Sequence, residues 1–330
     1  MIKMTTEAKI QITSSEIGIL WMIYTSQSAR LAVFSIFRDK TIDIEAKNIL
    51  DAYIIDTTNI KNKIINLFNN ENVVIPLGIN EQDIVSEAPP LFDDIFNIMN
   101  LRRATKLFTG RTGVFCIMSY MKELNDILKL DFEISNKYYM MTTNYLLGKG
   151  VLTKSPYVTM PKKVEFIEDK NYLSGYNILS DKRSLDTIEV GYISEAMENA
   201  ILDMKFLTGF AQVAKEIEVK KYLIEGKELL KKHIIELSNM LLQSDIELPS
   251  TRAGKVTDST QAPFSDKLMM YVNSLISNTP LGFTALGTSF SMRNDLPIKL
   301  GLISKDTLDY TRKGSKIMIK YKWMEQPPQM

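Results

Sequence analysis

The sequence predicts an all-α protein that consists of two tandem antiparallel four-helix bundles related by internal duplication. Three observations lead to this prediction. Landmarks of the first half recur at a constant offset in the second half, apolar residues follow helical spacing in four segments of each half, and proline or glycine lies at or beyond the ends of several of those segments. Almost no segment alternates apolar and polar residues as a half-buried strand would.

The duplication is visible as an offset of 173 residues that becomes 172 after one residue is lost in the loop behind Pro76. The early pairs are Glu16/Glu189, Gly18/Gly191, Glu45/Glu218, Lys47/Lys220, Asn66/Asn239 and Pro76/Pro249. The later pairs are Phe92/Phe264, Asp94/Asp266, Gly110/Gly282, Ser119/Ser291, Tyr138/Tyr310 and Pro156/Pro328. Identity between the halves is low, so the constancy of the offset is the evidence for a repeat.

The first two helices of each half have clear start and stop signals. Each first helix opens with a capping box, in which an N-cap oxygen precedes a glutamate by three residues. The capping pairs are Thr13/Glu16 and Asp186/Glu189. The second helices are expected over 43–70 and 216–244, and they end before Pro76 and Pro249, because proline cannot continue a helix.

The third and fourth helices follow a polar, proline-containing loop. The third helices are expected over about 92–119 and 264–291, with acidic residues in their first turns, where the helix dipole favours negative charge. The fourth helices are expected over about 123–148 and 295–326. Four amphipathic helices joined by short loops pack most simply as an antiparallel bundle.

The repeat also predicts the domain organisation. The first bundle is expected to occupy residues 1–160, a linker residues 161–184, and the second bundle residues 185–330. A chain of 330 residues is long enough for two domains that each bury a core.

Composition excludes several classes of protein. A hydrophobic content of 45% and a charged content of 24% are typical of a globular protein, and the net charge of +1 argues against a nucleic-acid partner. The single cysteine, Cys116, excludes an intrachain disulfide and fits a reducing compartment. No signal peptide and no transmembrane segment are visible, so a cytoplasmic protein is expected.

Four stretches of the chain resemble a known family. They are Phe264–Met270 (FSDKLMM), Trp323–Gln329 (WMEQPPQ), Val74–Gly78 (VIPLG) and Pro161–Phe166 (PKKVEF). The family occurs in endospore-forming bacteria, has tandem ferritin-like four-helix bundles and is described as similar to spore coat protein F. The resemblance spans nearly the whole chain. It implies a ferritin-like fold and an association with the spore, but no catalytic residue, because the role of the family is unknown and fold alone does not give function.

The ferritin-like fold raises the question of a di-iron centre. That chemistry needs two Glu-x-x-His pairs, and the chain has one histidine, His233, with Leu230 three residues before it. His233 therefore remains only a weak candidate metal ligand, and a partly buried, hydrogen-bonded core residue is the favoured alternative. Cys116 lies in the other half of the chain, so a Cys–His catalytic pair is not expected either. No metal, no cofactor and no enzymatic activity are predicted.

Comparison of the two halves gives the candidate site. Asp56, Arg103 and Asp131 lie on apolar stripes where the second half has Leu229, Leu275 and Ile303, and Tyr138 shares the stripe of Asp131. Since a lone buried charge costs several kcal/mol, we expect pairing, and helix lengths place Asp56 and Arg103 at a similar height. We therefore predict an Asp56–Arg103 ion pair inside the first bundle, next to a small polar cavity. The alternatives are that these charges lie at the bundle boundary in water, or that the pair is purely structural.

Two functions remain open at this stage. The first is a non-enzymatic structural or interaction protein, associated with sporulation or the spore coat, which would self-associate or bind protein partners through apolar surface patches. The second is a small-molecule-binding or metal-assisted bundle with its site in the core of the first repeat, formed by Asp56, Arg103, Asp131 and Tyr138.

Overall fold

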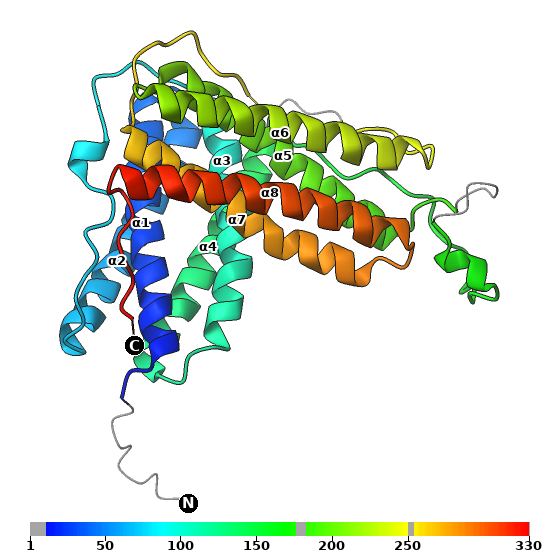
Figure 1. Cartoon of the computed structure of the whole chain (residues 1–330), viewed down its shortest axis with the longest axis horizontal. Coiled ribbons are helices and arrows are strands. Elements are labelled where there is room, and N and C mark those ends of the chain that lie inside the picture. The colour runs from blue at the N-terminus through cyan, green and yellow to red at the C-terminus, as the bar shows by residue number, and fades with distance from the viewer. Residues whose placement is uncertain (1–10, 176–182, 250–253, 330) are drawn as a thin grey trace, which may run out of the picture.

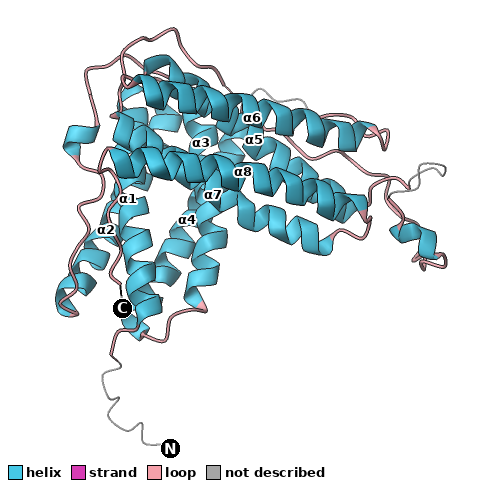
Figure 2. Ribbon diagram, viewed as in Figure 1, coloured by secondary structure: helices cyan, strands magenta, loops and turns pink. Residues whose placement is uncertain are grey.

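The structure, a computed structural model, describes residues 11–175, 183–249 and 254–329 of the chain. Within these residues it contains eight long helices, two short 3₁₀ turns and no strands (Figures 1 and 2). In the first repeat, the helices are α1 Ser14–Lys40, α2 Ile44–Asn70, α3 Asp94–Cys116 and α4 Lys122–Gly148, with the turn η1 Glu81–Asp83 between α2 and α3. In the second repeat, they are α5 Thr187–Val213, α6 Ile217–Leu242, α7 Asp266–Phe290 and α8 Asp295–Lys320, with η2 Lys170–Leu173 preceding α5.

The predicted all-α fold of tandem helical bundles is confirmed. In each repeat the first two helices pack against each other, as do the last two, and the two pairs close the bundle. The chain between α2 and α3 travels back along the bundle before α3 begins, as does the chain between α6 and α7 (Figure 1). The second connection of each repeat is therefore long, contrary to the expected short loop, and it makes the packed helix pairs antiparallel while α2 and α3 run in the same direction.

The two repeats form two arms that cross at a wide angle and share a core (Figure 1). One hydrophobic cluster contains residues of all eight helices and continues from one repeat into the other. A smaller cluster lies in the outer part of the second arm, around Leu185, Met197 and Leu300. The predicted domain bounds stay a prediction, and residues 176–182 of the predicted linker lie outside the described residues.

Backbone contacts between the two long connections reveal a pseudo-two-fold axis. Ile84 forms an isolated antiparallel bridge with Phe264, and Phe92 forms one with Val256. Each of these bridges is the image of the other under the sequence repeat. The flanking hydrogen bonds repeat in the same way: they are Val85 N to Pro263 O and Thr257 N to Leu91 O, then Asp93 N to Lys255 O and Ser265 N to Asp83 O. The repeats are therefore arranged like the subunits of a symmetric dimer.

An aromatic layer fills the space around this axis. Phe92 stacks on Phe96 at 4.2 Å between ring centroids and meets Phe206 of the other repeat at 5.3 Å. The contact of Phe92 with Phe210, at 6.4 Å, has its image in the contact of Phe264 with Phe37, at 6.3 Å. Aromatic pairs of this kind contribute about 0.5–1.5 kcal/mol each beyond the area that they bury.

In each repeat, a buried glutamate ties the start of the first helix to the turn between the third and fourth helices. The capping box of Glu16 is present as predicted, and its carboxylate also accepts hydrogen bonds from the backbone N–H groups of Tyr120 and Met121, at 2.8 and 2.7 Å. Glu189 does the same for Met292 and Arg293 in the second repeat. Burial alone would raise the pKa of Glu16, but the hydrogen bonds from Thr13, Met121 and Tyr120 outweigh it and lower the pKa to about 2.

The first prediction concerns Glu16. Replacement Glu16→Gln should lower the free energy of unfolding at pH 7 by about 2–3 kcal/mol, because one amide oxygen cannot serve all the donors that the carboxylate serves. A carboxyl group with a lowered folded-state pKa stabilises the protein above its unfolded-state pKa, and this stabilisation is lost as the pH falls from about 4.5 towards 2. Denaturant unfolding at several pH values would measure both effects. The exposed Glu123→Gln is the control, and equal acid sensitivity in wild type and Glu16→Gln would contradict the prediction.

Candidate functional site

Two of the four candidate residues, Asp56 and Tyr138, are joined by a hydrogen bond. The Tyr138 hydroxyl donates to Oδ2 of Asp56 at 2.7 Å, and Lys137 Nζ lies 3.0 Å from the same oxygen. Tyr138 is fully buried and packs edge-to-face on Tyr53, whereas about a third of the Asp56 side chain is exposed. Burial, followed by the hydrogen bond to Asp56, raises the pKa of Tyr138. The contact ties α2 to α4 at the edge of the core.

The predicted Asp56–Arg103 ion pair is not formed. Arg103 on α3 extends out of its own bundle, and its Nη2 lies 2.6 Å from Oδ1 of Asp203 on α5 and donates to the carbonyl of Ile276 at 3.3 Å. Helix lengths predicted that Arg103 and Asp56 lie at a similar height along the bundle. The face of α3 that carries Arg103, however, is directed to the second repeat. Both charged side chains are at least 94% buried, and burial raises the pKa of Asp203 to about 7 against the opposing charge of Arg103.

Asp131 is the centre of a buried polar cluster in the first bundle. Its Oδ1 accepts from Gln27 Nε2 at 2.9 Å and from Arg30 Nη2 at 3.2 Å, and its Oδ2 accepts from Thr112 Oγ1 at 3.0 Å. Arg30 also lies over the ring of Phe108, with 3.8 Å between its guanidinium carbon and the ring centroid. The buried ion pair of the first bundle is therefore Arg30–Asp131, and the predicted Asp56–Arg103 pair is wrong.

Sequence reasoning missed Arg30 although the repeat offered a signal. The position equivalent to Arg30 is Asp203, so the two halves carry opposite charges at one buried place on the first helix. The charges singled out from the sequence lie on the second, third and fourth helices, whereas position 30 lies on the first. Arg30 compensates Asp131, and Asp203 compensates Arg103, because each charge would be costly alone.

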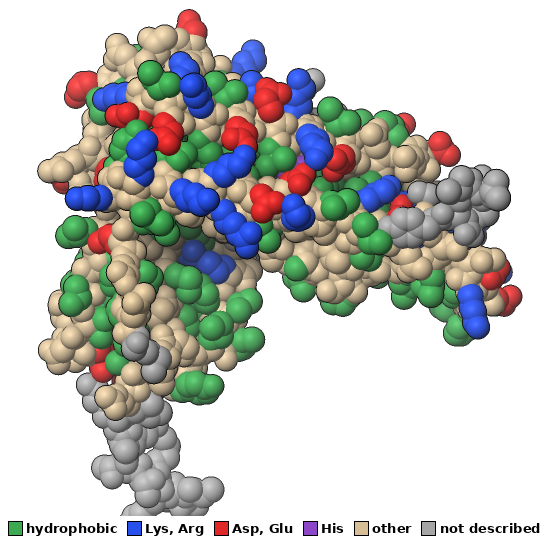
Figure 3. Space-filling view, in the orientation of Figure 1, with side chains coloured by type: hydrophobic (Ala, Val, Ile, Leu, Met, Phe, Trp, Pro, Cys, Tyr) green, Lys and Arg blue, Asp and Glu red, His purple; other side chains and the backbone are tan. Residues whose placement is uncertain are grey.

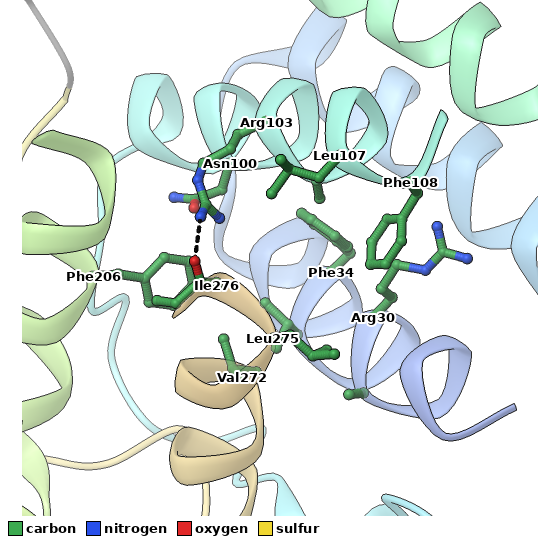
Figure 4. A pocket seen from close by; sticks show the side chains of 13 residues that line it. Arg30, Phe34, Asn100, Arg103, Leu107, Phe108, Phe206, Val272, Leu275 and Ile276 are labelled. Atoms are coloured by element: carbon green, nitrogen blue, oxygen red, sulfur yellow. Dashed lines mark hydrogen bonds between the residues drawn. The ribbon is translucent and has the colours of Figure 1, made fainter. Parts of the chain in front are cut away.

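A small cavity lies beside Arg30 and Arg103 (Figure 4). Its volume is about 60 Å³, and the side chains of Arg30 and Arg103 lie on its wall beside Phe34, Leu107 and Phe108. From the second repeat, Phe206, Val272, Leu275 and Ile276 line it. The cavity is on the pseudo-two-fold axis, since Arg103 and Leu275 are equivalent positions, and it has room for a few water molecules. It is not the predicted polar cavity, because Asp56 and Tyr138 do not line it.

His233 is buried in the second bundle, as expected, but it is not hydrogen bonded through Nε2. Among the described residues this atom has no hydrogen-bond partner, and it lies 4.0 Å from Oδ2 of Asp306 on α8. Burial lowers the pKa of His233 to about 4, although Asp306 acts in the opposite direction. In the parts of the chain that the structure describes, no group of three His, Cys, Asp or Glu side chains is arranged to hold a metal ion. Cys116 is half-buried, and burial raises the pKa of its thiol.

Comparison with known proteins shows the family. The family described as "Protein of unknown function (DUF3231)" matches residues 2–164 and again residues 174–330, so the chain belongs to this family and contains its domain twice. Among solved structures, the chain is similar to a "putative spore coat protein" from Bacillus halodurans, with a TM-score of 0.42 and 15% identity over 45% of this chain and 96% of that one. No curated protein matches the chain.

The second prediction tests the Arg103–Asp203 pair. Replacement Arg103→Leu, which copies the equivalent Leu275, should lower the free energy of unfolding by about 3–5 kcal/mol, because Asp203 is then buried without its partner. Asp203→Leu should be similarly destabilising, and the double variant should regain most of the loss. Urea denaturation of the four proteins would measure the coupling. Additive losses in the double variant would show that the two side chains do not interact.

The third prediction concerns the pH dependence of stability. A histidine whose folded-state pKa is lowered binds fewer protons in the folded than in the unfolded protein, so stability falls as the pH decreases from about 6.5 to about 4. This contribution amounts to about 3 kcal/mol. His233→Leu should remove it. Urea unfolding curves between pH 4 and 7.5 would show it as a difference between wild type and variant, and parallel pH profiles would contradict it.

Proposed function

We propose that this member of the DUF3231 family is a non-enzymatic structural protein that self-associates through the outer tips of its two arms. The four candidate residues of the first repeat are engaged in contacts that hold the fold. Arg103 is paired with Asp203, Asp131 with Arg30, and Tyr138 with Asp56. The charged residues that distinguish the repeats therefore stabilise the packing of the helices. A function has to be sought on the surface.

The tips carry the observation on which this proposal rests. At the turn between α3 and α4, Val114, Met118 and Tyr120 are exposed, and at the equivalent turn between α7 and α8 the exposed residues are Leu286, Phe290 and Met292. These are equivalent positions in the repeat, and all have exposed fractions between 41% and 72%. Exposed apolar groups that gather in one place mark interaction sites. Because the same group recurs at both tips, chance exposure is a poor explanation.

Charged and hydrophobic side chains gather on different parts of the surface. The visible face over α6 and α8 carries interleaved positive and negative side chains, while hydrophobic side chains gather on the arm of the first repeat (Figure 3). The two tips lie at the ends of the arms far from the shared core (Figure 1). A protein with two equivalent association sites is bivalent, and it can link copies of itself into extended assemblies.

The proposed context is sporulation. It is supported by the stretches Phe264–Met270 and Trp323–Gln329, which resemble a family of endospore-forming bacteria. None of the described helices is long and apolar enough to cross a membrane. An immunoblot of sporulating and vegetative cells is expected to find the protein in the sporulating cells, and equal amounts in both would remove this part of the proposal.

The fourth prediction tests self-association. Wild-type protein should form oligomers larger than dimers as its concentration rises, measured by sedimentation velocity and by native mass spectrometry. Met118→Lys with Tyr120→Lys blocks the first tip, and Phe290→Lys with Met292→Lys blocks the second. Each pair should stop assembly at the dimer, and all four substitutions together should leave a monomer, because charge on an apolar contact opposes its burial.

A matched control uses exposed apolar residues that do not recur in the repeat. Ile224→Lys with Ile235→Lys on α6 places the same charges on another surface, and it should leave assembly unchanged. A wild-type protein that stays monomeric at all concentrations, or assembly that survives all four tip substitutions, would overturn the proposal.

A further inference from the structure

The interface between the repeats contains two equivalent sites that have become different. One lies between α3, α5 and the segment after α4, and its cavity has a volume of about 10 Å³. The other lies between α7, α1 and the segment after α8, and its cavity has a volume of about 210 Å³. The pseudo-two-fold axis relates the elements of one site to those of the other. We call them the closed site and the open site.

Ion pairs across the interface occupy the closed site. Arg102 Nη1 lies 2.6 Å from Oε1 of Glu198, and Arg102 Nε donates to Thr143 Oγ1 at 3.0 Å. Lys106 Nζ lies 2.9 Å from Oε2 of Glu198 and 2.7 Å from Oε1 of Glu195. These long side chains span the gap between α3 and α5, so little space is left.

Short side chains take those positions in the open site. Ser274, Asn278 and Thr25 stand where the closed site has Arg102, Lys106 and Glu198. The hydroxyl of Ser274 donates to the carbonyl of Tyr271, and the hydroxyl of Thr25 to that of Trp21, each on its own helix. Tyr271 on α7 interacts with Thr25 on α1 across the gap, but among the described residues no ion pair joins these two helices as Arg102 and Glu198 join α3 and α5.

Aromatic side chains line the open site instead. Trp21, Tyr271 and Trp323 stand at positions that are Ser194, Met99 and Val151 in the other half. The chain has two tryptophans, and both lie on this cavity. Loss of the bridging charges and gain of aromatic walls therefore occur together at one site. A single large side chain pointing inward would have filled the space left by the bridging charges. Packing alone therefore does not require both the loss of these charges and the gain of aromatic walls.

The charged side chains of the open site already have hydrogen-bond or ion-pair partners. Lys267 Nζ donates to the carbonyl of Gly78 at 2.8 Å and lies 3.3 Å from Oδ2 of Asp83. Glu325 accepts from the backbone N–H groups of Leu77 and Gly78, at 2.7 and 2.8 Å. Both side chains hold the Gly78 turn, whose φ of +63° suits glycine. A ligand of this site therefore needs no net charge.

We propose that the open site binds a small, uncharged, planar aromatic molecule with a polar substituent. A cavity of about 150 Å³ holds benzene, so the open site has room for one ring and a substituent such as a carboxamide. Trp21, Tyr271 and Trp323 supply faces and edges for ring contacts, and Ser274, Asn278 and Ser315 supply hydrogen-bonding groups. This inference goes beyond the proposed self-association and does not depend on it.

The test uses four probes of similar size. Benzamide is the neutral aromatic probe, cyclohexanecarboxamide its non-aromatic match, and benzoate and benzylamine its charged matches. Tryptophan fluorescence reports directly on the site, because both tryptophans line it, and ligand-observed NMR detects binding independently. Benzamide should bind with a dissociation constant on the order of 10⁻⁴ to 10⁻³ M, within the range of affinity per atom for small ligands. The other three probes should bind at least about fivefold more weakly, for want of ring stacking or of a countercharge.

Two variants locate the binding. The triple variant Thr25→Glu, Ser274→Arg, Asn278→Lys copies the charges of the closed site and should weaken benzamide binding at least about tenfold. Trp323→Val, which copies Val151, should weaken it about fivefold while making a smaller change to the fold. Ser289→Arg places the same charge on an exposed position of α7 and is the control that should bind normally.

The possible outcomes are distinct. No benzamide binding up to about 10 mM, or binding that survives both the triple variant and Trp323→Val, would overturn the site. Equal binding of cyclohexanecarboxamide would overturn the aromatic class, and tighter binding of benzoate or benzylamine would overturn the uncharged class. The tip variants should still bind benzamide, so failure of the self-association proposal is separable from failure of this one.

Discussion

The burial of aromatic side chains from both repeats in one common layer is the constraint on which the rest of the structure depends. Phe92 and its equivalent Phe264 each lie against the phenylalanines of the other repeat, and their own backbones form the two bridges across the pseudo-two-fold axis. Neither bundle could leave this layer without exposing it to water. The position of the arms, the route of the long connections and the sites between the repeats all follow from this shared core.

Much of the fold was predictable because its signals are local. Capping boxes at Thr13 and Asp186 marked helix starts within a residue of the observed ones, and the constant repeat offset implied two copies of one bundle. The sequence did not show that the second connection of each repeat travels back along the bundle before the next helix begins. A polar, proline-containing segment gives no indication of where its far end docks, since the docking contacts are backbone bridges to the other repeat.

The candidate site was only partly predictable, and Arg103 shows why. An apolar stripe shows that a face is buried, but it does not show whether the bundle's own helices or the other repeat cover it. Arg103 was correctly expected to need a partner, yet that partner, Asp203, belongs to the other repeat. Positions 30 and 203 are equivalent in the repeat and carry opposite charges. This reversal of charge was the sequence signal for the partner that was missed. The aromatic open site could not be recognised without knowing which residues of α1 and α7 face each other.

The two bridges between the connections have a consequence for how the chain reaches its native state. Each bridge joins residues that are more than 160 positions apart, so neither can form until about half of the second repeat has been synthesised. During that interval the first repeat presents Phe37, Phe92 and Phe96 without the rings that later cover them. Contacts between distant segments slow folding, and uncovered apolar surface favours association with other chains. A nascent chain of this protein is therefore most vulnerable when its first half is complete and its second half is still missing.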